Sequence, residues 1–335
     1  MVEERMARKR GAVDCSLISG NAGVDVCPSS RRQFIAGAAS LAATTIAGST
    51  AGAQTPVVKR FRHGDFSIAI ISDGHLTVPT RFLARNASEA EIRASIGAAS
   101  DLVTPPCNVT LVRTPSETIL IDVGAGPHFM TGAGKLVENM DAAGIDRASV
   151  TKVVLTHAAH PDHLWGLVDD FDDTPQFPNA TYILATAEFE FWMADDAASR
   201  LPEDRQNFAP GAKRNLSRIK DKLQLIAPGA DIASGIRAID TSGHTAGHIS
   251  LEIASGNQML VVLADALTHP LISFAHPEWS PVADHHDPDR AIATRRNLLA
   301  RLASDRSLAI GFHLPFPGLG RVERNGSAFR YVSEV

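Results

Sequence analysis

The feature that most constrains this chain is the stretch at 156–166, which follows the apolar run at 153–155 and reads Thr-His-Ala-Ala-His-Pro-Asp-His-Leu-Trp-Gly. Its imidazole and carboxylate groups are the usual ligands of zinc and similar divalent ions. They are His157, His160, Asp162 and His163. Because Asp162 and His163 are neighbours, a regular strand would point them to opposite faces, and only a turn brings both to one centre. Pro161 suits the first turn of a helix. The stretch therefore predicts a buried strand that ends in a metal-binding turn, and the alternative is a polar loop rich in histidine.

Other side chains of the metal-ligand type lie where predicted strands end. Asp265 follows the apolar strand at 259–263, and His313 follows the strand residues 308–312. His244 lies in a glycine-flanked loop, Gly-His-Thr-Ala-Gly-His, between two strands. A side chain at a strand end is held by a rigid element and still faces a cleft. We therefore expect these residues to complete the site that begins at residue 157.

The order of the predicted elements indicates two sheets in one domain. Strand patterns occur at 66–74, 108–113, 118–122, 152–155 and 182–185, and again at 223–226, 235–239, 249–253, 259–263 and 308–312. Helical patterns occur at 135–143, 187–195 and 289–303. Two sheets packed face to face with helices outside satisfy this order. We expect one domain over 54–335, with a lid or loop-helix insertion at 197–220.

The first 53 residues have the composition of an export signal. Arg31 and Arg32 precede an apolar, small-residue stretch at 36–48, and Ala51 and Ala53 form an A-x-A cleavage pattern. This order resembles a cleaved twin-arginine signal over 1–53 and predicts a periplasmic or secreted protein. The apolar stretch is short and rich in alanine and glycine, so we expect no stable membrane anchor. The alternative is that it anchors the protein.

Net charge and cysteine content argue against a nucleic-acid-binding protein and against a disulfide-bonded one. The formal net charge of the chain is −5, which makes it a poor partner for nucleic acid. After removal of residues 1–53 only Cys107 remains, so the mature chain forms no internal disulfide. We expect its partner to be a small-molecule substrate.

Several motifs in order resemble those of metallo-β-lactamase-superfamily hydrolases, from about Phe66 to the carboxyl end. They are Asp-Val-Gly-Ala-Gly from Asp122, His-x-Asp-His from His160, the 243–248 loop, Asp265 and His313. The resemblance implies an αββα sandwich whose metal ligands lie on loops at one edge, and it implies a homodimer. Ile-Ser-Asp-Gly at 71–74 and the ending at 311–320 are most similar to the branch of methyl parathion hydrolase, the quorum-quenching lactonases and the chlorothalonil dehalogenase.

One position departs from the family pattern His-x-His-x-Asp-His. Its first histidine position is occupied by Ala158, and His157 is displaced by one residue. If the family's metal ligands are assigned to the matching positions of this sequence, the first metal site has only His160, His244 and Asp265, which it shares with the second site. The second site has Asp162, His163, His313 and Asp265.

Our hypothesis is one firmly bound zinc at the second site, with His160 and Asp162 as the acid and base. The alternative is that the loop adjusts, His157 becomes a ligand and two zinc ions bind. Iron and manganese remain alternative metals.

Residues outside the ligand set are expected to hold it or to line the substrate pocket. We expect Asp122 to orient a ligand histidine and His248 to be a hydrogen-bonded residue of its loop. Trp192, Phe274 and Trp279 are candidates for an apolar substrate pocket, with burial in the core as the alternative. The remaining histidines of this region are expected at the surface, and the alternative is that they line the pocket. They are His269, His276, His285 and His286.

The resemblance and the ligand types predict a hydrolase that uses a metal-bound hydroxide. A lactone or ester, a phosphotriester and an activated aryl halide all fit this chemistry. The sequence has no obvious basic group to bind an anion, which favours a neutral, fairly hydrophobic substrate. Two alternatives come from other classes: an iron-dependent persulfide dioxygenase, and a metal-free exported binding protein on the same scaffold.

Overall fold

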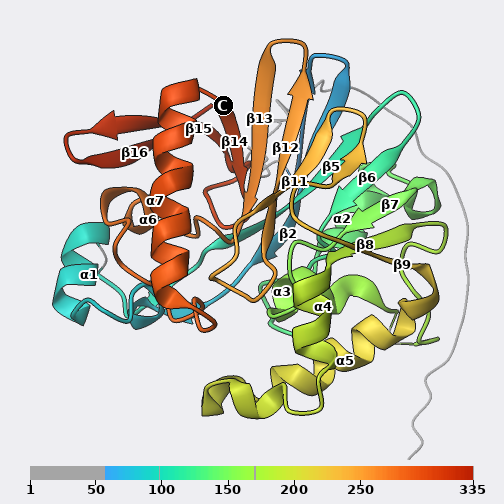
Figure 1. Ribbon diagram of the computed structural model, residues 1–335, viewed down its shortest axis with the longest axis horizontal. Coiled ribbons are helices and arrows are strands. Elements are labelled where there is room, and N and C mark those ends of the chain that lie inside the picture. The colour runs from blue at the N-terminus through green and yellow to red at the C-terminus, as the bar shows by residue number, and fades with distance from the viewer. Residues whose placement is uncertain (1–56, 98, 170, 335) are drawn as a thin grey trace, which may run out of the picture. The chain divides into compact units, whose positions relative to one another are not determined.

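Two seven-stranded sheets organise the chain in the computed structural model, which describes residues 57–97, 99–169 and 171–334 (Figure 1). The first sheet, in spatial order, consists of β1 (Val58–His63), β2 (Phe66–His75), β5 (Pro106–Arg113), β6 (Thr118–Ile121), β7 (Lys152–Val154), β8 (Thr181–Ala185) and β9 (Leu223–Ile226). The second consists of β10 (Asp231–Ala233), β11 (Ile236–Asp240), β12 (Ile249–Ser255), β13 (Gln258–Ala264), β14 (Leu308–Gly311), β15 (Leu319–Asn325) and β16 (Ala328–Ser333). A small sheet pairs β3 (Val78–Pro79) with β4 (Leu102–Val103).

Helices connect and cover these sheets. The α-helices are α1 (Glu89–Ile96), α2 (Leu136–Ala142), α3 (Pro161–Leu164), α4 (Thr186–Met193), α5 (Phe208–Arg218), α6 (Ile272–Ala275) and α7 (Pro288–Asp305). The 3-10 helices are η1 (Thr80–Leu83), η2 (Arg147–Ser149), η3 (Trp165–Leu167), η4 (Ala198–Arg200), η5 (Glu203–Arg205) and η6 (Lys220–Lys222). Among the described residues, no helix has the length and apolar character needed to cross a membrane.

Alternating side chains of the strands form separate apolar layers. In β2, Ile68 and Ile70 belong to the core between the two sheets, whereas Ala69 and Ile71 belong to the core beneath α2, α4 and α5. A third core lies between the second sheet and α7, whose Leu298 contributes to it. Figure 1 shows α7 running along the second sheet. The layers are therefore helix, sheet, sheet and helix, which confirms the predicted αββα sandwich.

Strand direction places the functional loops. Strands β6, β7 and β8 are parallel, and β13 is parallel to β14. The carboxyl ends of parallel strands meet at the same edge of a sheet. Asp122 and Leu155 follow β6 and β7, and Asp265 and Phe312 follow β13 and β14. The predicted ligands at strand ends are thus brought to one edge of each sheet.

The predicted helices agree with the observed ones where the sequence shows an apolar pattern over several turns. The patterns at 135–143, 187–195 and 289–303 correspond to α2, α4 and α7. Residues 197–220 fold as η4, η5 and α5, and Ala209, Ala212 and Leu216 of α5 enter the core of the first sheet. The predicted export signal at 1–53 lies outside the described residues.

A candidate metal centre

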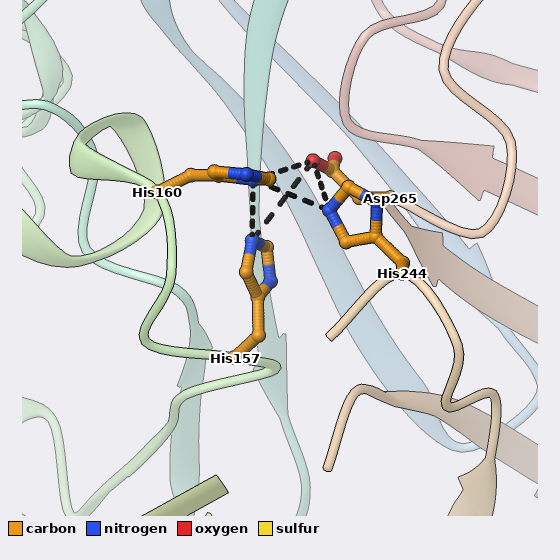
Figure 2. Close-up of side chains that lie close together, drawn as sticks. All are labelled: His157, His160, His244 and Asp265. Atoms are coloured by element: carbon orange, nitrogen blue, oxygen red, sulfur yellow. Dashed lines mark hydrogen bonds and ion pairs between the residues drawn. The ribbon is translucent and has the colours of Figure 1, made fainter. Parts of the chain in front are cut away.

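Four side chains from three loops converge in a first ligand group, shown in Figure 2. The distance from Nδ1 of His160 to Nε2 of His157 is 3.1 Å, and to Nε2 of His244 it is 3.2 Å. Oδ2 of Asp265 lies 3.2 Å from Nε2 of His244 and 3.5 Å from Nδ1 of His160. All four residues are buried. Three imidazole nitrogens and one carboxylate oxygen therefore face a common point.

A second group shares Asp265 with the first. Its Oδ1 lies 3.2 Å from Nε2 of His163 and 3.4 Å from Nε2 of His313. Oδ2 of Asp162 lies 3.2 Å from Nε2 of His313 and 3.7 Å from Nε2 of His163. The two oxygens of Asp265 thus belong to different groups, which is the geometry of a carboxylate that bridges two cations.

The donor sets fit metal ions. Zinc binds imidazole nitrogen at roughly 2.0–2.1 Å, so the ligands of a tetrahedral ion are about 3.3 Å apart. The distances of 3.1–3.2 Å between ring nitrogens in the first group are close to that spacing. In the second group Oδ2 of Asp162, Nε2 of His163 and Oδ1 of Asp265 are buried without a hydrogen-bond partner among the described residues. Buried polar atoms without partners are costly, and a cation at the second group would satisfy these three.

Contacts to the second ring nitrogen orient four of the five histidines. Nδ1 of His163 donates to Oδ2 of Asp122 at 2.8 Å, and Nδ1 of His244 donates to Oδ1 of Asp284 at 2.8 Å. Nδ1 of His313 donates to the Pro106 carbonyl at 2.9 Å. Nδ1 of His157 lies 3.1 Å from the Thr156 hydroxyl. Such contacts set the tautomer and leave Nε2 of each ring for a metal.

His157 belongs to the first group, which differs from our preferred hypothesis. Carrying the family pattern over position by position left that group with two imidazoles, because Ala158 occupies the first histidine position. The chain between β7 and α3 instead brings Nε2 of His157 within 3.1 Å of His160. Counting residues fails here because a loop, unlike a strand, does not fix the direction of each side chain by its position. The number of bound metals remains a prediction.

Carboxylates and burial act against each other in setting the pKa values at the centre. Burial lowers the pKa of His163, but Asp265, Asp122 and Asp162 outweigh it and hold the value well above the usual range. Burial also lowers the pKa of His244, yet Asp265 and Asp284 raise it to about 9. Burial raises the pKa of Asp265, but His163 and His313 hold it well below its usual value. Asp265 is therefore ionised, which is the charge state that a carboxylate shared by two cations would need.

The predicted supporting residues occupy positions beside the ligands. Asp122 has a φ of 62° and also accepts hydrogen bonds from the amide and hydroxyl of Thr156. His248 accepts a hydrogen bond from the Asp265 amide at 3.1 Å and contacts the Thr241 hydroxyl at 2.8 Å. Burial, reinforced by His244, lowers the pKa of His248 to about 3, so the ring is neutral as that acceptor role requires.

Glu188, on α4, joins two ligand loops and was missed in the sequence. Its Oε1 accepts from the Ala158 amide at 2.9 Å and from Nε1 of Trp192 at 2.7 Å. Its Oε2 accepts from the Thr245 hydroxyl at 2.7 Å and the Gly247 amide at 2.8 Å. The side chain is fully buried. One carboxylate thereby fixes the loop that bears His157 to the loop that bears His244.

Two further buried aspartates were not assigned a role from the sequence. Asp284, which accepts from His244, also pairs with Arg295 at 2.6 Å, and that guanidinium is itself buried. Asp73 accepts from the amides of Ala125, Gly134 and Leu136 at 2.8, 3.3 and 2.7 Å. Burial raises the pKa of Asp73 to about 6 despite these bonds. Asp284 thus orients a ligand, and Asp73 holds the loop between β6 and α2.

A cavity of about 380 Å³ opens beside both ligand groups, and His160, Asp162, Asp265 and His313 line it. Its apolar side chains include Leu76, Phe82, Leu83, Phe129, Met130 and Phe208. They come from the turn between β2 and β3, from η1, from the loop held by Asp73, and from the start of α5. The cavity is therefore predominantly apolar around a polar, ligand-rich end.

The aromatic residues predicted for the pocket do not line this cavity. Trp192 is 1% exposed in the core of the first sheet, and Phe274 is fully buried beneath α7. Trp279 stacks on His276 with ring centres 3.9 Å apart and packs on the small core around Ile92. Burial of a large aromatic side chain contributes more free energy than burial of a small one, so these residues pack in the cores. Trp192 and Phe274 thus take the alternative considered from the sequence, burial in the core, and Trp279 lies outside the lining of this cavity.

The histidines expected at the surface lie in different environments. His286 is exposed, whereas His269, His276 and His285 are partly buried. The His285 ring centre lies 5.7 Å from that of His160, closer to the centre than expected. Burial, with help from His160 and His244, lowers the pKa of His285 to about 2. Nδ1 of His269, which precedes α6 in the chain, accepts from the amides of Leu271 and Ile272.

Comparison with known proteins agrees with this architecture. No curated protein sequence matches the chain. A solved complex of AidC, described as a dizinc quorum-quenching lactonase, is 29% identical with a TM-score of 0.77, and the match covers 83% of this chain and 97% of AidC. The hydrolase AbOPH of the beta lactamase superfamily is 27% identical with a TM-score of 0.78, over 84% of this chain and 99% of that one. A probable metal-dependent hydrolase from Staphylococcus aureus, 17% identical with a TM-score of 0.69 over 82% of this chain and 99% of its own, shares the fold.

The family comparison gives the same result over most of the described chain. Residues 103–309 match the family described as the metallo-beta-lactamase superfamily. That range contains every residue of the first ligand group and all of the second except His313. The chain therefore belongs to the metallo-β-lactamase superfamily and is a hydrolase of that superfamily.

Proposed function

We propose that this protein is a zinc-dependent hydrolase that binds two ions and cleaves an apolar lactone or ester. The observation that carries the proposal is the pair of ligand groups joined by the two oxygens of Asp265. The likeness to AidC, a dizinc lactonase by its description, supports both the metal number and the substrate class. The apolar cavity beside the groups supports a substrate with a hydrophobic body.

The roles of the side chains follow from their positions. His157, His160, His244 and Asp265 would hold one ion, and Asp162, His163, His313 and Asp265 the other. Zinc, when bound, lowers the pKa of a coordinated water and polarises the substrate carbonyl. Asp162 lines the cavity and is ionised, since His163 and His313 outweigh burial and lower its pKa. It is therefore placed to accept a proton at the cavity and to pass it to the leaving oxygen.

Metal analysis and a substrate panel test this function. We expect elemental analysis of the purified protein to find about two zinc ions per chain, and dialysis against a chelator to abolish hydrolysis until zinc is restored. The panel should contain a fatty-acyl lactone, a phenyl ester, a phosphotriester and an activated aryl halide. Hydrolysis of the lactone or the ester is expected to be fastest. Bound iron with oxygen uptake would instead support a dioxygenase, and no metal with no turnover would support a binding protein.

Replacing His157 by alanine tests the first ligand group. Since Nε2 of His157 lies 3.1 Å from Nδ1 of His160 in that group, its loss leaves two imidazoles and one carboxylate oxygen. We expect the zinc content to fall from about two to about one per chain and kcat/KM to fall by at least about 100-fold. A His286→Ala variant, altered at an exposed histidine, should keep both ions. Two tightly held ions in His157→Ala would show that His157 is not a ligand.

A further inference from the structure

Arg205 brings a positive charge into the otherwise apolar part of the cavity. It ends η5, in the segment between α4 and α5, and its side chain lines the same cavity as His160, Asp162 and Asp265. The Cζ atom lies 6.0 Å from the ring centre of Phe82 and 6.0 Å from that of Phe208. The aromatic rings therefore contact the guanidinium, which cation–π attraction favours.

Nearby carboxylates compensate the guanidinium only in part: burial lowers the pKa of Arg205 although Asp204 and Asp162 act to raise it. Arg205 is only 8% exposed, yet among the residues that the structure describes its side chain makes no hydrogen bond or ion pair, and Nε is a buried donor without a partner. Two carboxylates, those of Asp162 and Asp265, also line the cavity. They contact the histidines of the ligand groups instead of Arg205. Burying a charge is costly unless a partner compensates it.

Other buried arginine in this protein is compensated. The guanidinium of Arg295 pairs with Asp284 at 2.6 Å and donates to the carbonyls of Pro277 and Trp279 at 3.2 and 2.8 Å. Nε lacks a partner in both arginines, but the terminal nitrogens of Arg205 have no such hydrogen bonds among the described residues, and Arg205 faces a cavity large enough for a ligand. The difference indicates that the missing partner of Arg205 is a molecule that enters the cavity.

We propose that Arg205 is a specificity-determining residue that binds a carboxylate carried by the substrate at a distance from the bond that is cleaved. This inference rests on the proposed ester or lactone hydrolysis and refines its substrate class to an apolar chain that ends in an anionic group. A planar guanidinium fork matches a carboxylate with two parallel hydrogen bonds. The lining of the cavity thereby combines residues of the two ligand groups, apolar side chains and one guanidinium. The sequence offered no obvious basic group to bind an anion, and the structure places Arg205 in the lining of the cavity.

A matched pair of esters tests the proposal. Phenyl hexanoate and monophenyl adipate have acyl chains of equal length, and only the second carries a terminal carboxylate. In Arg205→Met, which keeps an unbranched apolar stem, we expect KM for monophenyl adipate to rise by about 10- to 100-fold with little change in kcat. The KM for phenyl hexanoate should stay within about 3-fold of the wild-type value. Arg205→Lys should recover part of the loss, because it keeps the charge and loses the fork.

Lys213→Met, on the following helix α5, is the control for loss of a positive charge. Lys213 lies on α5 at the surface, where it pairs with Asp195. This variant should treat both esters as the wild type does. An Arg205→Met protein that loses both esters equally, or neither, would overturn the proposal. Thermal unfolding of each variant separates a folding defect from a binding defect.

Equilibrium binding separates failure of this inference from failure of the proposed reaction. Calorimetry should compare hexanoate with adipate as ligands of the zinc-loaded protein, which requires no turnover. We expect adipate to bind more tightly than hexanoate in the wild type and the two to bind equally in Arg205→Met. If neither ester is hydrolysed but this difference appears, the hydrolytic assignment fails and the role of Arg205 stands. If adipate has no advantage in the wild type, the role of Arg205 fails whatever the reaction.

Discussion

Replacing Asp265 by asparagine is expected to reduce kcat/KM by at least about 1,000-fold and to release metal. The two carboxylate oxygens lie 3.2 Å from Nε2 of His244 and 3.2 Å from Nε2 of His163, so a single side chain serves both ligand groups. An amide keeps one acceptor oxygen and loses the negative charge that two cations would share. Loss of an outer contact to a ligand already costs about 10- to 100-fold, and loss of a shared ligand must cost more.

Kinetics and elemental analysis of the same preparation check this result. We expect the zinc content of Asp265→Asn to fall below one ion per chain. Asp231→Asn, altered at an exposed residue of β10, removes a carboxylate elsewhere and should change neither quantity. If Asp265→Asn keeps two ions and near-normal turnover, Asp265 does not bridge the groups.

Replacing Glu188 by alanine is expected to lower the free energy of unfolding by about 3–5 kcal/mol. The substitution leaves four buried donors without their acceptor: the amides of Ala158 and Gly247, the Thr245 hydroxyl and Nε1 of Trp192. It also removes the connection between the loop of His157 and the loop of His244. We therefore expect weaker zinc binding as well as lower stability, measured by urea unfolding and by competition with a chelator.

The same helix supplies a control for Glu188. Glu190 is exposed, and Glu190→Ala should change the free energy of unfolding by no more than about 0.5 kcal/mol. Glu188→Gln, which retains one acceptor oxygen, should fall between wild type and Glu188→Ala. A stability loss in Glu188→Ala no larger than in Glu190→Ala would show that the four hydrogen bonds contribute little.

Local sequence patterns were sufficient to predict helices whose apolar face extends over several turns. Helix α7 begins at Pro288, after Asp287 accepts a hydrogen bond from the Arg290 amide, and Leu298, Leu299 and Leu302 form its buried face. Each of these signals lies within a few residues of the next and is visible in the sequence. Helix α1 was not predicted, although Ser88 and Glu91 form the capping box that marks its start.

The sequence by itself determined the two-sheet sandwich and the ligand-type residues at its strand ends, because strand direction and residue chemistry are local properties. Only the tertiary structure decided that His157 joins the first group, since the course of a loop depends on what holds it, here Glu188 on α4. It also decided that Trp192 and Phe274 fill cores and that Arg205 reaches the cavity. Contacts between segments far apart in the chain depend on which buried groups find partners, and no local pattern records that outcome.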